Sequence, residues 1–330
     1  MAGSKLGQSI FVCSASEKLT VSQNKKQIWK SLFNILRIIV PAILIGWIIS
    51  TVDWDILIPL VRKIPWWMLL ASAVVFSLSQ IVIAIRWYYL LHFINATAPF
   101  FHLLDFVFIG SFASNFLPTT IGGDAVKIVG ITREHPQRAV AAASVIADRL
   151  FNLAGMLLLF PLVFALPSVQ IPFILKSHPL TVAGFSGLNL WEKNKERVRQ
   201  TWIQVRRWFT SFQCVFTSLA LSWLSIFLAF ASFWIVTYAV GIRISFLRAS
   251  AIGQLSYFVA LFPLSINGLG LLESSETYLL TLQGATREQA VAAAFLIRLV
   301  TMFVSLFGGV RLMRVGRDIL SKSKQKSTDG

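Results

Sequence analysis

Charged residues and cysteines are both scarce in this sequence. Asp, Glu, Lys and Arg make up 13% of the 330 residues, against 56% hydrophobic residues, and the mean hydropathy is +0.70. A soluble domain carries about 25% charged residues, so the composition excludes a soluble globular chain and indicates that the bilayer is the solvent. The two cysteines, Cys13 and Cys214, cannot form a disulfide framework.

The groups that support enzyme chemistry are also few. No metal-ligand spacing relates the four histidines, His92, His102, His135 and His178. There is no nucleophile-elbow serine and no pair of carboxylates on a polar scaffold. The glycines at 122, 123, 268 and 270 lack the lysine and strand context of a nucleotide-binding loop, so unwound backbone or close helix packing explains them better. We therefore expect no catalytic residue, no metal and no cofactor.

Long apolar runs are what the chain has instead. Crossing about 30 Å of hydrocarbon takes about 20 apolar residues in a helix. Such runs cover 32–52, 66–93, 139–166, 212–241 and 291–313, and two more, 102–130 and 246–283, are interrupted by Pro and Gly. The sequence predicts an all-α polytopic membrane helical bundle at 31–317, between a basic tail at 1–30 and another at 318–330. The first run lacks a cleavage pattern, so we expect it to stay in the membrane.

The net charge is +16, and the Lys and Arg residues concentrate in the N-terminal tail, in 193–207 and after Arg311. Because cations near a span resist translocation, these segments are expected to be cytoplasmic in an inner-membrane protein. We expect no nucleic-acid partner, since aromatics and grooves among the charges are missing. If all three segments are cytoplasmic, 102–130 crosses the membrane an odd number of times and 246–283 an even number. Either one basic segment is external, or 246–283 is a hairpin and 102–130 is not, and the sequence leaves this choice open.

The segment 191–212 has an apolar stripe surrounded by basic residues. The stripe consists of Trp191, Val198, Trp202, Val205, Phe209 and Phe212. A basic amphipathic helix of this kind favours an anionic membrane surface, where each cation contributes about 1 kcal/mol. The alternative is a solvated extension of the span that follows it.

The two interrupted segments belong to a probable internal repeat, with halves at about 102–166 and 246–313. Asp124 and Glu273 are 149 positions apart, and so are Arg149 and Arg298, although the prolines Pro118 and Pro263 are only 145 apart. Paired interrupted segments point to a transporter site, because broken helices expose backbone groups only where they line a cavity. The alternative is that both prolines kink continuous spanning helices.

Charged side chains inside spans cost about 2.5 to 3.5 kcal/mol each, so each needs a partner or a task. Arg149 and Arg298 are placed to offer guanidinium groups to a lipid phosphate, and the repeat acids to orient them or to couple protons. The alternative is that acids and arginines only neutralise one another within the bundle. Arg86 lies nearer a span end, where we expect it to reach the interface.

These residues resemble the flippase-like transmembrane domain of lysylphosphatidylglycerol synthases and its stand-alone relatives. The resemblance rests on Arg86-Trp87, on the stretch from Asn115 to Asp124, on Asp148-Arg149, and on the run from Pro263 to Gly270 that closes with Glu273. It implies an inner-membrane domain that moves a polar-headed lipid between leaflets. Lys127 and Leu272 stand where the family often has Arg, and Asp148 where it often has Glu. The synthases' aminoacyl-transfer domain is not expected here.

We therefore expect lipid transport, with a phospho- or polyprenyl-linked lipid as the substrate. The alternative is a membrane scaffold or regulatory subunit for a separate glycosyl- or aminoacyl-transferase. The candidate substrate-binding residues lie in or near the interrupted segments or are charged within spans: Arg86, Asn115, Pro118, Gly122, Gly123, Asp124, Asp148, Arg149, Pro263, Ser265, Asn267, Gly268, Glu273 and Arg298.

Overall fold

The computed structural model describes residues 46, 50, 53–96, 98–116, 122–134, 137–166, 195–261 and 268–328, and within these ranges it contains helices and no strand. The predicted all-α membrane bundle is confirmed. The elements are α2 (Trp54–Arg62), α3 (Trp66–Phe93), α4 (Phe100–Phe116), α5 (Gly122–Glu134), α6 (Arg138–Leu158), the 3-10 helix η1 (Phe160–Ala165), α7 (Lys195–Thr210), α8 (Phe212–Ala239), α9 (Phe246–Ala260), α10 (Leu271–Leu282) and α11 (Arg287–Thr328).

Four stretches of these helices are long and apolar enough to cross a membrane: Trp66–Phe93, Arg138–Phe164, Phe212–Ala239 and Arg287–Met313. They coincide with four of the five uninterrupted apolar runs in the sequence. The remaining run, 32–52, lies outside the described residues except for Gly46 and Ser50. The chain is a multi-pass membrane protein.

The helices form two series, α3 to α6 and α8 to α11, that match in order. The long helices α3 and α8 each contain 28 residues and begin 146 positions apart. The helices α5 and α10 begin 149 positions apart, as do α6 and α11. The correspondence therefore reaches further toward the N-terminus than the repeat halves that the sequence suggested, because it includes α3 and α8.

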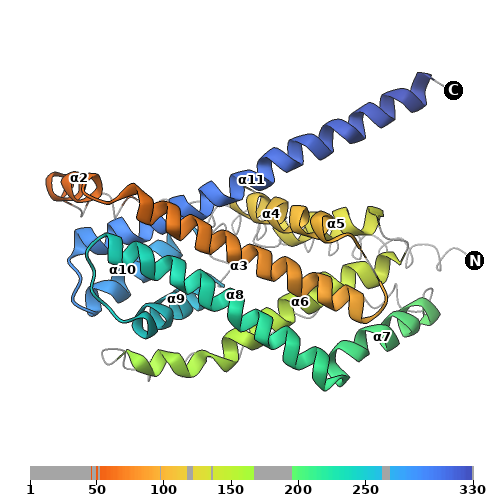
Figure 1. Cartoon of the computed structure of the whole chain (residues 1–330), viewed down its shortest axis with the longest axis horizontal. Helices are drawn as coiled ribbons and strands as arrows, with labels where there is room; N and C mark the ends of the chain where they lie inside the picture. Colours follow the sequence, from red (N-terminus) through yellow and green to blue (C-terminus); the bar gives the residue numbers. More distant parts are fainter. Residues whose placement is uncertain are drawn as a thin grey trace, which may run out of the picture.

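Each series contains a helical hairpin where the sequence has its interrupted segment. The helix α4 packs against α5, and α9 packs against α10. The two hairpins enter the bundle from opposite ends, and α3 and α8 run in opposite directions beside each other, so the two series are inverted relative to one another (Figure 1). Neither interrupted segment is a continuous helix with a proline kink, because the chain folds back in both. Pro118 and Pro263 themselves lie outside the described residues.

This arrangement bears on the topology that the sequence left open. Cytoplasmic placement of all three basic segments implied an odd number of crossings in 102–130 and an even number in 246–283, but α5 returns along α4 and α10 returns along α9 (Figure 1). The described residues on either side of the gap between the two series lie at opposite ends of the bundle, η1 at one end and the start of α7 at the other (Figure 1). The two equivalent segments therefore have the same topology.

The interface between α3 and α8 consists largely of small side chains. Ser72 and Ser79 of α3, and Ser218, Ser222, Ser225 and Ser232 of α8, are all buried. The hydroxyls of Ser72 and Ser232 are 2.8 Å apart and hydrogen-bonded. Small residues allow helix backbones to approach closely in a membrane, where packing and hydrogen bonds replace the hydrophobic effect.

The basic helix α7 is separate from α8. Ser211, between them, has an extended backbone, so the two helices are not continuous. Trp208 is buried, and its indole N–H donates to the Leu90 carbonyl at 2.8 Å. Trp202 and Phe209 of the predicted apolar stripe are exposed instead. Trp191 lies outside the described residues.

The two series are joined by a close contact between α4 and α11. A Cβ added at Gly308 would collide with the backbone carbonyl of Phe108. The Asn115 amide donates to the Ser305 hydroxyl at 3.0 Å across the same interface. Gly123 of α5 faces the Gly110 carbonyl of α4 in a similar way. Close packing of α5 on α4 therefore accounts for the glycine at position 123.

We predict that Gly308→Leu destabilises the protein by about 1 to 3 kcal/mol or more, because backbone cannot move aside as a flexible side chain does. Thermal unfolding of the detergent-solubilised protein measures the effect. Val310→Leu is the matched control, since Val310 lies nearby on α11 and is exposed. Equal unfolding temperatures for the two variants would contradict the contact.

Candidate functional site

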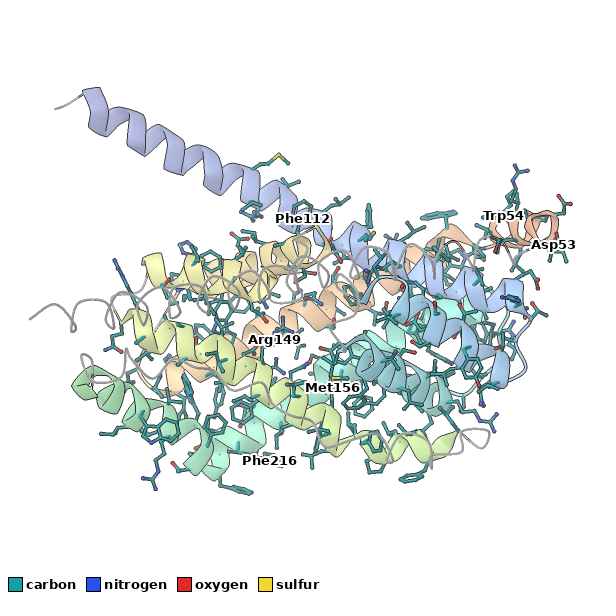
Figure 2. The ribbon with its side chains drawn as sticks, turned by 180° about the vertical axis from the view of Figure 1, so that it is seen from behind. Asp53, Trp54, Phe112, Arg149, Met156 and Phe216 are labelled. Carbon is teal, nitrogen blue, oxygen red and sulfur yellow. The ribbon has the colours of Figure 1, made fainter. Side chains whose placement is uncertain are left out.

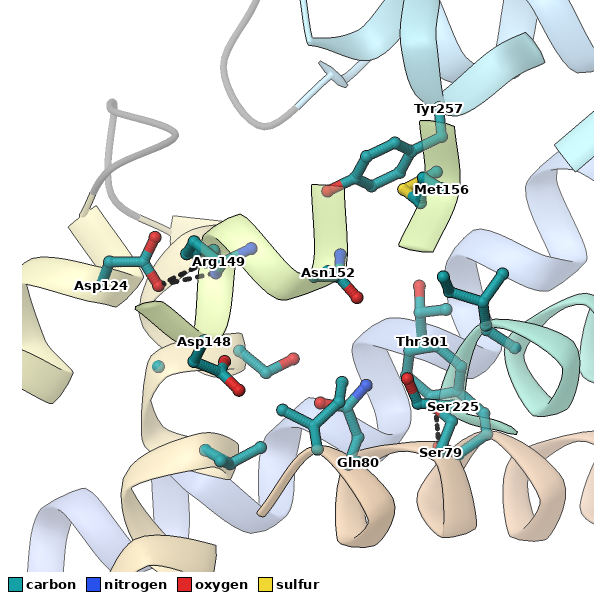
Figure 3. A pocket seen from close by; sticks show the side chains of 18 of the residues that line it. Ser79, Gln80, Asp124, Asp148, Arg149, Asn152, Met156, Ser225, Tyr257 and Thr301 are labelled. Carbon is teal, nitrogen blue, oxygen red and sulfur yellow. Dashed lines mark hydrogen bonds and ion pairs between the residues drawn. The ribbon is translucent and has the colours of Figure 1, made fainter. Parts of the chain in front are cut away.

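A cavity of about 550 Å³ lies between the two series and is lined by side chains from both. Figure 2 places Arg149 and Met156, two of its lining residues, in the middle of the bundle. Its charged lining residues are Arg86, Asp124, Lys127, Asp148, Arg149 and Arg298. Uncharged polar groups, including Gln80, Asn152, Tyr257 and Thr301, also line it (Figure 3). Water or a polar ligand in this cavity is therefore in contact with charged side chains.

The innermost ion pair joins Arg86 of α3 to Asp148 of α6. Arg86 Nε lies 2.7 Å from Asp148 Oδ1, and the two side chains are 2% and 8% exposed. Arg86 also donates to the Ser222 hydroxyl of α8 at 2.6 Å. The expectation that Arg86 reaches the membrane interface is wrong, because its guanidinium is buried and ties three helices together. This pair has the character of a structural anchor.

A second ion pair joins Arg149 of α6 to Asp124 of α5. Arg149 donates to Asp124 Oδ1 from Nη2 at 2.6 Å and from Nε at 2.9 Å. The Arg149 side chain is 42% exposed and lines the cavity, as Figure 3 shows. The carboxylate therefore orients the guanidinium while leaving part of it accessible. The spacing of 25 residues brings together the acid and the arginine that the sequence analysis singled out.

The corresponding pair in the second series joins Arg298 of α11 to Glu273 of α10. Arg298 Nε lies 3.2 Å from Glu273 Oε1. The other oxygen of Glu273 accepts a hydrogen bond from the Gly270 backbone N–H at 2.7 Å. Gly270 has a φ of 80° and Gly268 a φ of 70°, values that favour glycine. These glycines therefore form the turn that starts α10 and presents Glu273 to Arg298.

Lys127 of α5 is a cavity cation that the sequence analysis noted only as a departure from a family pattern. It is 7% exposed, and among the described residues it has neither a hydrogen bond nor an ion pair. Gly110 leaves room for it, because a Cβ there would lie 2.6 Å from Lys127 Cε. The lining thus contains four cations and two anions, and its excess charge is positive.

The remaining candidate residues are distributed as follows. Asn115 lines the cavity, and Gly122 and Gly123 begin α5. Pro118, Pro263, Ser265 and Asn267 lie outside the described residues. Sequence reasoning missed Gln80, Asn152, Tyr257 and Thr301 of the lining. Their only signal was a polar side chain in an apolar helix, which many structural residues share.

We predict that Arg86→Met and Asp148→Leu, made singly, each destabilise the protein by about 3 to 5 kcal/mol, because each leaves an uncompensated buried charge. The double variant should recover much of this loss. Chemical denaturation in detergent measures the three values. Arg149→Met is the comparison, and its cost should be smaller because Arg149 is partly exposed. Additive losses in the double variant would refute a direct coupling.

Comparison with known proteins agrees with this architecture. The sequence profile described as the lysylphosphatidylglycerol synthase TM region matches residues 34–309, well over half of the chain. A UPF0104 membrane protein of Pyrococcus horikoshii is 21% identical over 305 residues, covering 77% of this chain and 89% of the relative. The matched range contains α3 to α10, the first half of α11 and all six charged residues of the cavity. The protein belongs to the family of the lysylphosphatidylglycerol synthase transmembrane region.

Proposed function

We propose that this protein moves an anionic, polar-headed lipid between the leaflets of the membrane, with the headgroup in the cavity. The observation that carries the proposal is that Arg149 and Arg298, one from each series, line a single cavity together with Lys127. Three cations at one site favour a phosphate or phosphodiester group. The substrate class is therefore a phospholipid or a polyprenyl-linked phosphate.

The ion pairs of the cavity supply a way to bind and release such a group. A guanidinium binds phosphate oxygens and carboxylate oxygens with similar fork geometry. A headgroup phosphate can therefore replace Asp124 on Arg149, or Glu273 on Arg298, without leaving an arginine uncompensated. When the lipid leaves, the carboxylate takes the arginine back, so the empty cavity is stable as well.

The outer surface of the bundle suits the lipid tails. Exposed apolar side chains occur on the spanning helices, among them Leu78, Leu150, Leu224 and Phe303. The tails can remain in the bilayer while only the headgroup enters the cavity. Inverted repeats around a central site allow the same movement to open the site toward either leaflet.

We further propose that the end of the bundle bearing α7 faces the cytoplasm, with this helix at an anionic leaflet of the inner membrane. Arg206 and Arg207 are exposed on α7 beside the exposed Trp202 and Phe209. The C-terminal part of α11, which contains Arg311, extends toward the same end (Figure 1). Lys and Arg near spans favour the cytoplasmic side.

Reconstitution in proteoliposomes tests the proposed transport. Fluorescent phosphatidylglycerol, phosphatidylethanolamine and polyprenyl phosphate, followed by quenching from outside, separate the substrate classes. We predict that Arg149→Ala and Arg298→Ala each lower the rate for the preferred anionic probe about tenfold or more, since a hydrogen bond to a charged group contributes about 1.5 to 3 kcal/mol.

Arg248→Ala is the matched control, because Arg248 is an exposed arginine at the start of α9 outside the cavity lining. Parental rates in both cavity variants would overturn the proposal. A parent that moves none of the probes but co-purifies with a membrane transferase would favour the scaffold alternative, and changes at Arg206 should then weaken the association.

A further inference from the structure

The two series place different charges at one corresponding position. Asp124 is the third residue of α5, and Glu273 is the third residue of α10. Three residues later, on the same helix face, α5 has Lys127 and α10 has Glu276. The first centre, Asp124 with Lys127 and Arg149, therefore has two cations and one acid. The second centre, Glu273 with Glu276 and Arg298, has two acids and one cation.

Glu276 is a buried acid that the proposed transport does not use. It is 5% exposed, and its Oε2 is sealed from solvent with no hydrogen-bond partner among the described residues. Both oxygens of the neighbouring Glu273 are engaged, one by Arg298 and the other by Gly270. Glu276 therefore shares its surroundings with a carboxylate whose counter-charge is already in use.

The charges that act on Glu276 come from two helices. Glu273 acts from the same helix, α10, and Arg298 acts from α11. The other helix packed against α10 is α9, and no ionisable side chain of α9 contributes among the described residues. Arg298, the ion-pair partner of Glu273, is thus the one cation among the described residues whose charge acts on Glu276 as well. Ionising both would leave a net negative charge in a buried site, which is costly without a second cation.

We propose that the second centre is a proton-binding site, in which Glu276 carries a proton while Arg298 is paired with Glu273. The inference rests on the proposed function where it concerns lipid. When an anionic headgroup draws Arg298 away, Glu273 loses its counter-charge and takes one proton from water. That proton returns to water when Arg298 goes back to Glu273. No bond other than O–H forms or breaks.

This linkage gives the two centres different tasks. The first centre binds the anion, because Lys127 and Arg149 exceed the charge of Asp124. The second centre converts the position of Arg298 into uptake or release of a proton. Because headgroup binding at Arg298 is coupled to proton uptake, that binding strengthens as the pH falls. Thermodynamic reciprocity then requires a bound headgroup to increase the proton affinity of Glu273.

Infrared difference spectroscopy of the full chain in nanodiscs tests the proton site without any transport. A protonated carboxyl group has its own C=O stretching band, which shifts on exchange from H₂O to D₂O. We expect this band at neutral pH in the parent and its loss in Glu276→Gln. Glu288→Gln is the matched control, because Glu288 is a partly exposed acid in the first turn of α11 and its replacement should leave the band unchanged.

A band that persists in Glu276→Gln overturns the proposal. If Glu276→Gln does not fold, the parental spectrum is the test. The absence of a protonated-carboxyl band from the parent at neutral pH also overturns the proposal. In proteoliposomes, the parental rate for fluorescent phosphatidylglycerol should rise as the pH falls, and the rate of Glu273→Gln/Glu276→Gln should not. A band without any lipid movement leaves the proton site standing and refutes the proposed transport, whereas lipid movement without the band refutes the proton site.

Discussion

The structure depends on one constraint, which is that a guanidinium group inside an apolar bundle requires a carboxylate partner. Arg86, Arg149 and Arg298 each have one, supplied in every case by a different helix. Because the partners come from different helices, each pair also fixes how two helices lie. The same interactions that make the charges tolerable in the membrane therefore determine the shape of the cavity between them.

The degree of exposure separates the roles of the three pairs. Arg86 and Asp148 are sealed and tie α3, α6 and α8 together, so they suit a permanent contact. Arg149 is paired but partly exposed to the cavity, which is what the proposed exchange of one oxyanion for another requires. Arg298 is intermediate in exposure, and the proposed proton site adds a second carboxyl group, Glu276, three residues from its partner Glu273.

Hydropathy was sufficient to predict the spanning helices, because burial in lipid requires length and apolarity that the sequence displays directly. The 25-residue spacing also marked the pairs Asp124 with Arg149 and Glu273 with Arg298. Arg86 could not be assigned in this way, because its partner Asp148 is 62 residues away and nothing local indicates the contact. Its position near the end of an apolar run favoured the membrane interface, whereas the side chain is buried inside the bundle.

The fold-back of the two hairpins was equally hidden, since Pro and Gly interrupt a kinked helix and a hairpin alike. The missing information was the packing of α4 on α5 and of α9 on α10. Trp208 shows the same limit on a smaller scale. The helical stripe predicted which residues of α7 are apolar, but the helix docks through a tryptophan outside that stripe because Leu90 offers a carbonyl.

The contact of α4 with α11 has a consequence for how the chain is assembled. The helix α4 of the first series packs on the last helix of the second, where Gly308 leaves room for the Phe108 carbonyl, and α3 packs along α8. The cavity is lined by side chains of both series. The two series therefore pack together as two different subunits of a dimer would, although they belong to one polypeptide. The cavity lies at the interface between them.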